Sequence, residues 1–349
     1  MISIFELPTS YTITFIIMAF ILGAVIGSFL NVVILRTPLK QSIVKNRSHC
    51  MSCGNQLKNI DLIPIFSYIF LRGKCRFCKA RISPRYWIVE LTTALLYVAA
   101  LCVLGFTVNT IYAFVLFPVL VVASGIDIDN MEIPYLCSIL IAVMGIISFF
   151  TDKEMLWHEH LLGAVVIGVP FAILAMFGAM GGGDVQLMAA AGLLLGWKNI
   201  PAAAIGIVLG AIFGGIILLT TPRHKKNETS EAIEKIATEW YDIQKENGVF
   251  VTDGNSDAIY GQIFKGKCEF EKDCYDIKLW SKAPDIDDLN ARLNEHKLND
   301  FSVSFMIEEG KITNVRCNKQ IVFGPYLSVG IAVAYLFGDQ IIDWYLRFF

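Results

Sequence analysis

Three long runs of the sequence contain no lysine, arginine, aspartate or glutamate, and these runs limit what the chain can fold into. They cover residues 7–35, 91–126 and 161–183. Each run is longer than the about 20 residues that an α-helix needs to cross the hydrocarbon core of a bilayer. The composition agrees, because 55% of the 349 residues are hydrophobic and only 17% are charged. The sequence therefore predicts a membrane protein and argues against ordinary water-soluble domains.

Eight apolar segments are expected to form helices that cross the membrane. Because eight is an even number, both ends of the chain would lie on the same, external side. The first segment is expected to remain as a membrane helix, because its uncharged run is about twice the length of the apolar core of a signal peptide. The eight segments are residues 12–35, 87–105, 110–127, 133–150, 160–180, 184–197, 200–220 and 325–345.

Lysine and arginine residues are concentrated in two of the connecting segments. Of the 29 basic residues, 11 lie within residues 36–85 and 15 within residues 223–319. Cytoplasmic loops of membrane proteins carry an excess of lysine and arginine. Both segments are therefore predicted to lie in the cytoplasm.

Two pairs of cysteines lie in the first of these segments. Cys50 and Cys53 form one pair and Cys75 and Cys78 the other, with 21 residues between the pairs. Such spacing lets four thiolates bind one zinc ion, and a reducing cytoplasm disfavours disulfides. We expect a structural zinc site, with a redox-active thiol pair or unliganded cysteines as alternatives. A nucleic-acid-binding knuckle is disfavoured because the segment is tethered between two membrane helices, so no nucleic-acid partner is expected.

Residues 221–320 differ in composition from the rest of the chain. They include 19 acidic and 15 basic residues and no apolar run that approaches a membrane span. Helices are expected at residues 227–247 and 284–296, and the alternation in residues 301–307 and 312–315 is typical of a β-hairpin. The segment is predicted to be a small soluble domain, either as a tolerated surface insertion or as a docking site for a secretion-system partner.

Together these features predict an all-α polytopic membrane protein with about eight transmembrane helices, a cytoplasmic zinc-binding segment and a small soluble α+β insertion. Membrane lipid would surround the helices. The expected parts are the first transmembrane helix (1–35), the zinc-binding segment (36–86), the transmembrane core (87–220), the insertion (221–320) and the last transmembrane helix (321–349).

Two aspartates are candidates for catalysis. Asp127 ends the third predicted helix, and Asp184 follows three glycines, Gly181, Gly182 and Gly183, at the start of the sixth. An aspartate in the bilayer costs about 2.5 to 3.5 kcal/mol on insertion scales and is seldom retained without a partner or a water-filled cavity. Of two close carboxylates, one can stay protonated as a general acid while the other takes a proton from an attacking water. The glycines would let a substrate strand approach the pair closely.

Two other interpretations of these acids remain open. Each aspartate alone could simply cap a helix at the membrane interface. A transporter could also line an ion path with paired aspartates, but both acids are expected at one face of the membrane and no inverted repeat is evident. Asp129 and Glu132, which lie just beyond Asp127, are expected to be solvated.

The order of these motifs resembles that of the prepilin peptidase family, also called type IV leader peptidases, which are aspartic proteases of the GxGD type. The resemblance covers about residues 12–220 and 321–345. It implies that Asp127 and Asp184 are the catalytic pair and that residues 87–220 are a protease core. The motifs that carry it are Gly-Ser-Phe-Leu-Asn-Val-Val at residues 27–33, the two cysteine pairs, Ile-Ser-Pro-Arg-Tyr at residues 82–86, Asp127, and Gly-Gly-Gly-Asp at residues 181–184.

The resemblance also implies a function. Members of the family cleave the basic leader of type IV prepilins or pseudopilins after a glycine, at the cytoplasmic face of the bacterial inner membrane. Many members also methylate the new N-terminal amine with S-adenosylmethionine, an activity associated with the cysteine-bearing segment. Pilus or type II secretion components are then expected partners. A related GxGD protease with a non-pilin substrate is the alternative.

Three features depart from the pattern of the family. Tyr135 follows Ile133 and Pro134 where the family often has Leu-Pro-Asp, and Gln186 stands where a lysine is frequent. The third departure is the insertion at residues 221–320, which resembles nothing known in the family. The first two departures leave the catalytic pair intact but bear on substrate preference.

Overall fold

The computed structural model places most of the helices, the cysteine-bearing segment and part of the insertion. The chain forms two compact units, residues 1–211 with 322–349, and residues 212–321. The residues that the structure describes are 4–38, 41–45, 48–50, 53–130, 132–151, 155–177, 180–196, 199–220, 235–236, 238–240, 242–243, 246, 259–264, 267–270, 301–308, 311–319 and 322–347.

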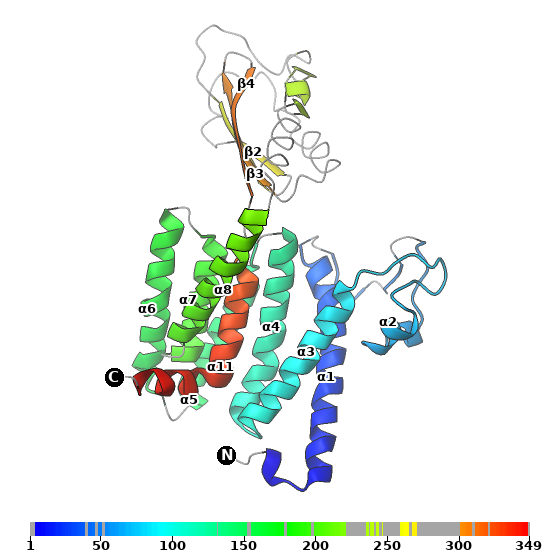
Figure 1. Ribbon diagram of the computed structural model, residues 1–349, viewed down its shortest axis with the longest axis vertical. Coiled ribbons are helices and arrows are strands. Elements are labelled where there is room, and N and C mark those ends of the chain that lie inside the picture. The colour runs from blue at the N-terminus through cyan, green and yellow to red at the C-terminus, as the bar shows by residue number, and fades with distance from the viewer. Residues whose placement is uncertain are drawn as a thin grey trace. The chain divides into compact units, whose positions relative to one another are not determined.

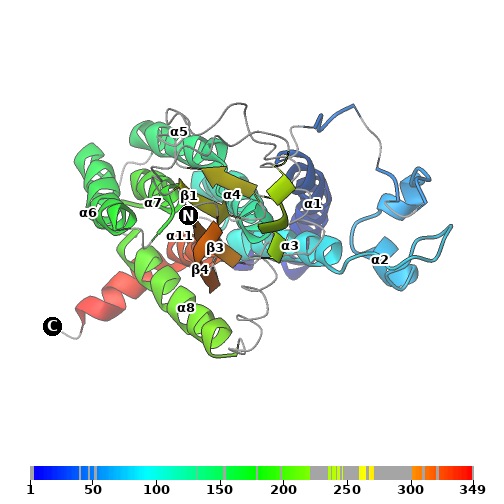
Figure 2. The same cartoon turned by 90° about the horizontal axis from the view of Figure 1, so that it is seen from above.

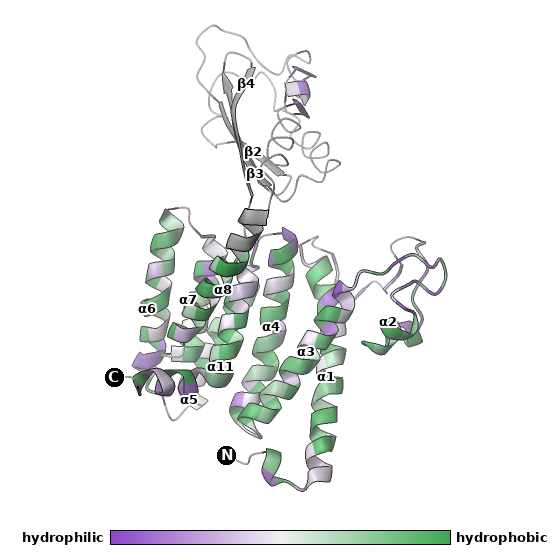
Figure 3. Ribbon diagram, viewed as in Figure 1, coloured by the Kyte–Doolittle hydropathy of each residue, from purple (hydrophilic) through white to green (hydrophobic). Residues whose placement is uncertain are grey.

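Eight apolar helices dominate the described part of the chain, and they coincide with the eight predicted segments (Figure 1). Hydrophobic residues extend along most of each helix in the first unit (Figure 3). The prediction of a mostly helical membrane protein is therefore confirmed. The helices are α1 (Thr9–Arg36), α3 (Arg85–Leu104), α4 (Val108–Asn130), α5 (Tyr135–Thr151), α6 (Trp157–Met176), α7 (Gly182–Leu195), α8 (Asn199–Thr220) and α11 (Gly324–Leu346).

Five of these helices, α1, α3, α4, α6 and α11, are long and apolar enough to cross a membrane by themselves. The apolar parts of α5, α7 and α8 are shorter. Large apolar side chains such as Ile21 and Val165 are exposed on the outer faces of the helices. Such surfaces are expected to face lipid, whereas a water-soluble protein rarely exposes large apolar patches. Passage of all eight helices through the membrane stays a prediction.

Helix α4 lies near the centre of the first unit. It packs against α1, α3, α5 and α11, which surround it when the bundle is viewed along its length (Figure 2). Leu116 and Phe117 of α4 are completely buried, together with Ile141 of α5, Leu187 of α7 and Ile331 of α11. This central position explains why α4 can carry a buried acid at its carboxyl end.

The short connections make successive helices alternate in direction. Helix α1 begins and α11 ends at the same end of the bundle (Figure 1). The opposite end contains the carboxyl end of α4 and the amino ends of α3, α7 and α11, and the cysteine-bearing segment leaves α1 there. Both candidate aspartates therefore lie at the end of the bundle where the cysteine-bearing segment begins and ends.

The second unit contains a four-stranded antiparallel sheet in the order β2-β1-β3-β4. The predicted hairpin is confirmed, because β3 pairs with β4 from Phe301 with Lys319 to Glu308 with Lys311. The described residues between 235 and 246 are helical, within the first predicted helix. The predicted helix at residues 284–296 lies outside the described residues, so an α+β fold for the whole insertion is not established. The strands are β1 (Ile259–Phe264), β2 (Lys267–Phe270), β3 (Phe301–Glu308) and β4 (Lys311–Lys319).

Candidate active site and metal centre

The two cysteine pairs lie on turns that share the same backbone hydrogen bonds. The amides of Cys50 and Cys75 each donate to the carbonyl of the residue five positions later, at 3.0 and 2.8 Å. The amides of Gly54 and Lys79 donate back to the carbonyls of these cysteines, at 2.9 and 3.1 Å. Gly54 and Lys79 both have a positive φ, 70° and 59°, so each turn ends with a left-handed residue. The chain therefore forms the same local structure twice.

Together the two turns bring four sulfur atoms into one cluster. The Sγ atoms of Cys50, Cys53, Cys75 and Cys78 all lie within 4.8 Å of one another, and those of Cys50 and Cys78 are 3.8 Å apart. Four zinc–sulfur bonds of about 2.3 Å in tetrahedral geometry place the sulfur atoms about 3.8 Å apart. The four cysteines thus fit a zinc ion and leave no open coordination position for a catalytic water.

The neighbouring thiols act against ionisation of Cys78. A hydrogen bond with the Ala80 backbone lowers the pKa of the Cys78 thiol, but lost hydration and hydrogen bonds with the other three cysteines outweigh it and raise this pKa to about 11. A cation among the sulfur atoms would favour the thiolate form instead. A bound metal would therefore relieve the electrostatic conflict within the cluster.

An ion pair connects the second turn to the segment between the turns. Arg76 Nη2 lies 2.6 Å from Asp61 Oδ1, and Arg76 Nε donates to the same oxygen at 2.7 Å. The hydrogen bond and the charge of the buried Asp61 raise the pKa of Arg76, so the guanidinium remains charged. This pair positions the second turn through contacts that do not depend on a metal.

Asp127 and Asp184 lie at the same end of the bundle, and both side chains are buried. They are 5% and 8% exposed, respectively. Asp127 belongs to the last turn of α4 and Asp184 to the first turn of α7. Helices α4 and α7 both pack against α5 and α11, so the helix ends that carry the two acids share the same neighbours. The structure thus brings together the two acids that the sequence analysis singled out, and their joint action on one water stays a prediction.

Sequence reasoning missed a contact between Asp127 and the start of the last helix. The backbone amide of Gly324 donates a hydrogen bond of 2.8 Å to Asp127 Oδ2. A Cβ atom at position 324 would lie 2.5 Å from the same oxygen, so only glycine fits without a shift. The Gly324-Pro325 sequence marks the start of a helix. Nothing in its spacing, however, connects it to an aspartate 197 positions away.

The three glycines before Asp184 have different surroundings. The amide of Gly181 donates to Asp184 Oδ2 at 3.3 Å, and a side chain at Gly183 would press on Ile133 Cβ at 3.1 Å. A Cβ atom at Gly182 would meet nothing within 4 Å. Among the described residues, no donor reaches the buried Asp184 Oδ1. Among the described residues, a side chain would therefore find room at Gly182, whereas Gly183 serves the packing of α7.

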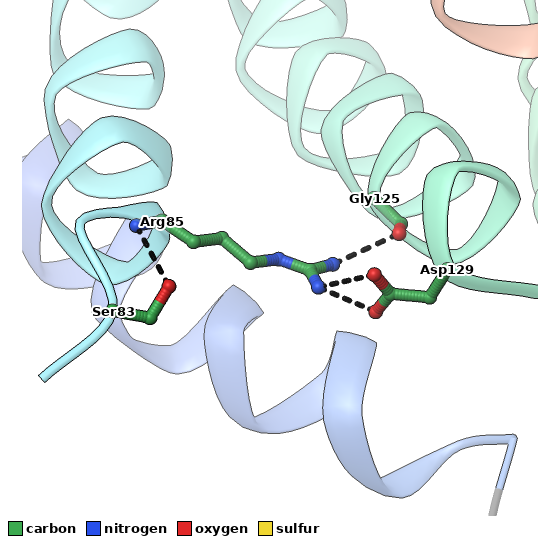
Figure 4. Close-up of polar contacts among 4 residues, drawn as sticks. All are labelled: Ser83, Arg85, Gly125 and Asp129. Carbon is green, nitrogen blue, oxygen red and sulfur yellow. Dashed lines mark hydrogen bonds and ion pairs between the residues drawn. The ribbon is translucent and has the colours of Figure 1, made fainter. Parts of the chain in front are cut away.

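Asp129 is exposed, as expected, but its carboxylate also pairs with Arg85, the first residue of α3 (Figure 4). Arg85 Nη2 also donates to the carbonyl of Gly125, at 2.9 Å. A guanidinium near the carboxyl end of a helix is favoured by the helix dipole. Arg85 therefore joins the end of the cysteine-bearing segment to the turn of α4 that carries Asp127.

The glycine-containing motif at residues 27–33 holds α1 against α3. A Cβ atom at Gly27 would lie 2.8 Å from Glu90 Cα, so the two helices approach closely there. Asn31 Nδ2 donates to the Tyr86 carbonyl at 3.1 Å. The motif therefore has a packing role next to the cysteine-bearing segment.

Comparisons with known proteins agree with this arrangement. Residues 21–104 match the bacterial peptidase A24 N-terminal domain, and residues 114–219 match the type IV leader peptidase family. The first match contains the four cysteines and the second contains Asp127 and Asp184. The insertion at residues 221–320 lies outside both matches. No solved structure matches the chain significantly.

Several curated relatives carry related names. The prepilin leader peptidase/N-methyltransferase of Myxococcus xanthus is 38% identical over 230 residues, which cover 62% of this chain and 68% of the relative. The protein of the same name from Bacillus subtilis is 35% identical over 204 residues, 58% of this chain and 82% of the relative. An Escherichia coli "Type 4 prepilin-like proteins leader peptide-processing enzyme" is 31% identical over 228 residues, 58% of this chain and 85% of the relative. This chain belongs to the type IV leader peptidase family, the prepilin peptidases.

Proposed function

We propose that this peptidase removes the leader from prepilins or pseudopilins with Asp127 and Asp184 as its catalytic pair. The names of the relatives support prepilin processing. The assignment of the pair rests on one observation: two buried carboxylates, in the last turn of α4 and the first turn of α7, lie at the same end of the bundle. The other buried acids among the described residues, Asp61 and Glu90, are held by the Arg76 guanidinium and by the backbone amide of Ile65.

The hydrogen bonds distinguish the proposed roles of the two acids. The Gly324 amide stabilises an ionised Asp127, which suits a general base that takes a proton from water. A protonated Asp184 suits the general acid, because no donor among the described residues faces its Oδ1. The water oxygen attacks the carbonyl carbon of the scissile bond, and Asp184 supplies the proton to the leaving nitrogen. Rupture of the carbon–nitrogen bond then yields a leader with a new carboxyl group and a pilin with a new amine.

We place the active site at the cytoplasmic face of the bacterial inner membrane. The support for this is the basic cysteine-bearing segment, which leaves the same end of the bundle as the two aspartates. A substrate would approach beside Gly182, where the space next to the backbone is open. Components of a type IV pilus or type II secretion system are the proposed partners.

Methylation of the new amine is the second proposed step. Its support is the name N-methyltransferase that several relatives carry. S-adenosylmethionine supplies the methyl group when it is bound. Zinc bound by the four cysteines would order the segment with which this activity is associated, without taking part in either reaction.

The mass of the products tests the proposed function. The purified protein in lipid vesicles should convert a prepilin into a free leader and a pilin that begins directly after the leader's final glycine. With S-adenosylmethionine present, the pilin should also gain the mass of one methyl group. An unchanged prepilin would contradict the proposal, and cleavage of a different membrane protein alone would favour a non-pilin substrate.

The Arg85–Asp129 pair is expected to position α4 for catalysis. Replacing Arg85 with alanine should lower kcat about tenfold with little change in KM, because Asp127 would lose a fixed position without loss of substrate contacts. Steady-state kinetics on a prepilin substrate, in protein with unchanged zinc content, checks this.

The matching variants show whether the two residues act as a unit. Asp129→Ala should have a similar effect, and the double variant should be no slower than either single variant. Exchange of the two charges, Arg85→Asp with Asp129→Arg, should restore part of the rate. Losses that multiply in the double variant would mean that the residues act independently.

Replacing residues 221–320 with a short flexible linker should leave cleavage largely unchanged, because residues 212–321 form a compact unit of their own. The linker must retain Gly324 at the start of α11, since its amide binds Asp127. The same deletion with Gly324→Val serves as the control and should lose activity. Complete loss of cleavage in the first variant, if it is still inserted and zinc-loaded, would show that the insertion shapes the active site.

A further inference from the structure

The segment between the two cysteine turns contains an uncharged apolar run. No lysine, arginine, aspartate or glutamate occurs in residues 62–71, and this run includes the short helix α2 (Phe66–Phe70). Several of its large side chains are exposed, above all Phe70 at 81% and Phe66 and Ile69 at 55% each. We call Leu62, Ile63, Phe66, Ile69 and Phe70 the apolar patch. Exposure of such a patch to water would be costly, so it marks a surface that is covered by another molecule.

The contacts of Ile65 show how far this run reaches along the membrane helices. Ile65 is buried in a cluster with Ala24 of α1 and Ala94 of α3. Ala94 lies nine residues beyond the start of α3, which corresponds to about 14 Å along a helix. Ala24 lies twelve residues before the end of α1, or about 18 Å. The run therefore packs against the sides of α1 and α3, well away from the end of α1 and the start of α3 that flank the cysteine-bearing segment.

A buried carboxylate holds the run in this position. Glu90 Oε2, on α3, accepts a hydrogen bond of 2.7 Å from the backbone amide of Ile65, which precedes the first residue of α2. The amides at the start of a helix have no partner within the helix. In an apolar environment such an amide needs a protein acceptor, because water is absent. The position of Glu90 thus fits a run that lies in hydrocarbon.

The apolar patch continues a surface that already faces lipid. Helix α2 lies on the side of the bundle that α1 and α3 form (Figures 1 and 2), where Ile65 contacts both helices. The outer face of α1 exposes Ile21, Val25 and Phe29. Directly after the run, the chain is strongly basic, with Arg72, Lys74, Arg76, Lys79 and Arg81. An apolar face next to a basic one is typical of an element that lies in the interface of an anionic bilayer.

We propose that residues 62–71 are inserted into the leaflet on the side of the cysteine turns, with the apolar patch against lipid acyl chains and the basic residues at the phosphate groups. The inserted run would fix the two turns at the membrane surface on either side of it. The segment at residues 36–86 is then not wholly in water, contrary to the expectation from its charge. Lipid therefore covers the apolar patch. The experiment must distinguish this from a patch that binds the apolar helix of a substrate.

Photo-cross-linking tests this placement. A benzophenone amino acid replaces Phe70 in the full-length protein, which is reconstituted in vesicles of phosphatidylcholine and phosphatidylglycerol. The matched control carries the same probe at Val44, which is 91% exposed and lies in the charged part of the segment before the first turn. After illumination, mass spectrometry should find phospholipid attached at position 70 in most of the cross-linked protein and little at position 44.

Three results would overturn the proposal. Equal lipid attachment at both positions, or none at position 70, would mean that the patch lies outside the hydrocarbon. When prepilin is added, attachment of prepilin at position 70 in place of lipid would show that the patch is a substrate surface. The Phe70 side chain makes few contacts, so the probe should leave zinc content and prepilin cleavage unchanged.

Discussion

Replacing Cys50 and Cys75 together with serine should remove the zinc from the purified protein. Together the two substitutions take one ligand from each turn, and the two remaining thiols cannot complete a tetrahedral site. Elemental analysis should therefore find about one zinc ion per chain in the unaltered protein and almost none in the double variant. The expected change is close to complete because the four sulfur atoms form a single cluster.

The control for this measurement is Cys102→Ser. Cys102 lies half-buried in α3, outside the cluster, so this variant should keep its zinc. Absence of zinc from the unaltered protein, or full zinc in the double variant, would contradict the assignment. Loss of zinc should also impair methylation more than cleavage, since the Asp61–Arg76 and Arg85–Asp129 pairs would still hold parts of the segment.

The membrane helices could be predicted from the sequence because their signal is local. A run of about 20 apolar residues is enough to indicate a membrane helix, whatever its neighbours are. The cysteine cluster is similar, since the two-residue spacing within each pair specifies a metal-binding turn. The hairpin of β3 and β4 was also predictable, because the alternation of its residues lies within one short stretch.

The contacts that complete the site could not be predicted, because they join residues far apart in the sequence. Asp127 meets Gly324 across 197 positions, and Asp129 meets Arg85 across 44. Both contacts depend on how helices pack, and hydrophobic patterns do not encode which helices are neighbours. The proposed lipid contact of residues 62–71 could not be predicted for another reason. A run of ten uncharged residues is too short to indicate a membrane span.

Asp127→Asn and Asp184→Asn should each lower prepilin cleavage by about 10³-fold or more, because asparagine keeps the shape of the side chain but can neither accept nor donate the proton. Asp129 is unsuitable as the control, since it pairs with Arg85. Asp343→Asn is a better control, because Asp343 is an exposed carboxylate near the far end of α11. This variant should cleave at the rate of the unaltered protein.

Catalysis by the aspartate pair is tested most directly by the initial rate of prepilin cleavage in vesicles, measured for these three variants and normalised to zinc content as a check of folding. Joint action of the two acids on one water predicts background rates for Asp127→Asn and Asp184→Asn and a normal rate for Asp343→Asn. Near-normal cleavage by either Asp127→Asn or Asp184→Asn would contradict it.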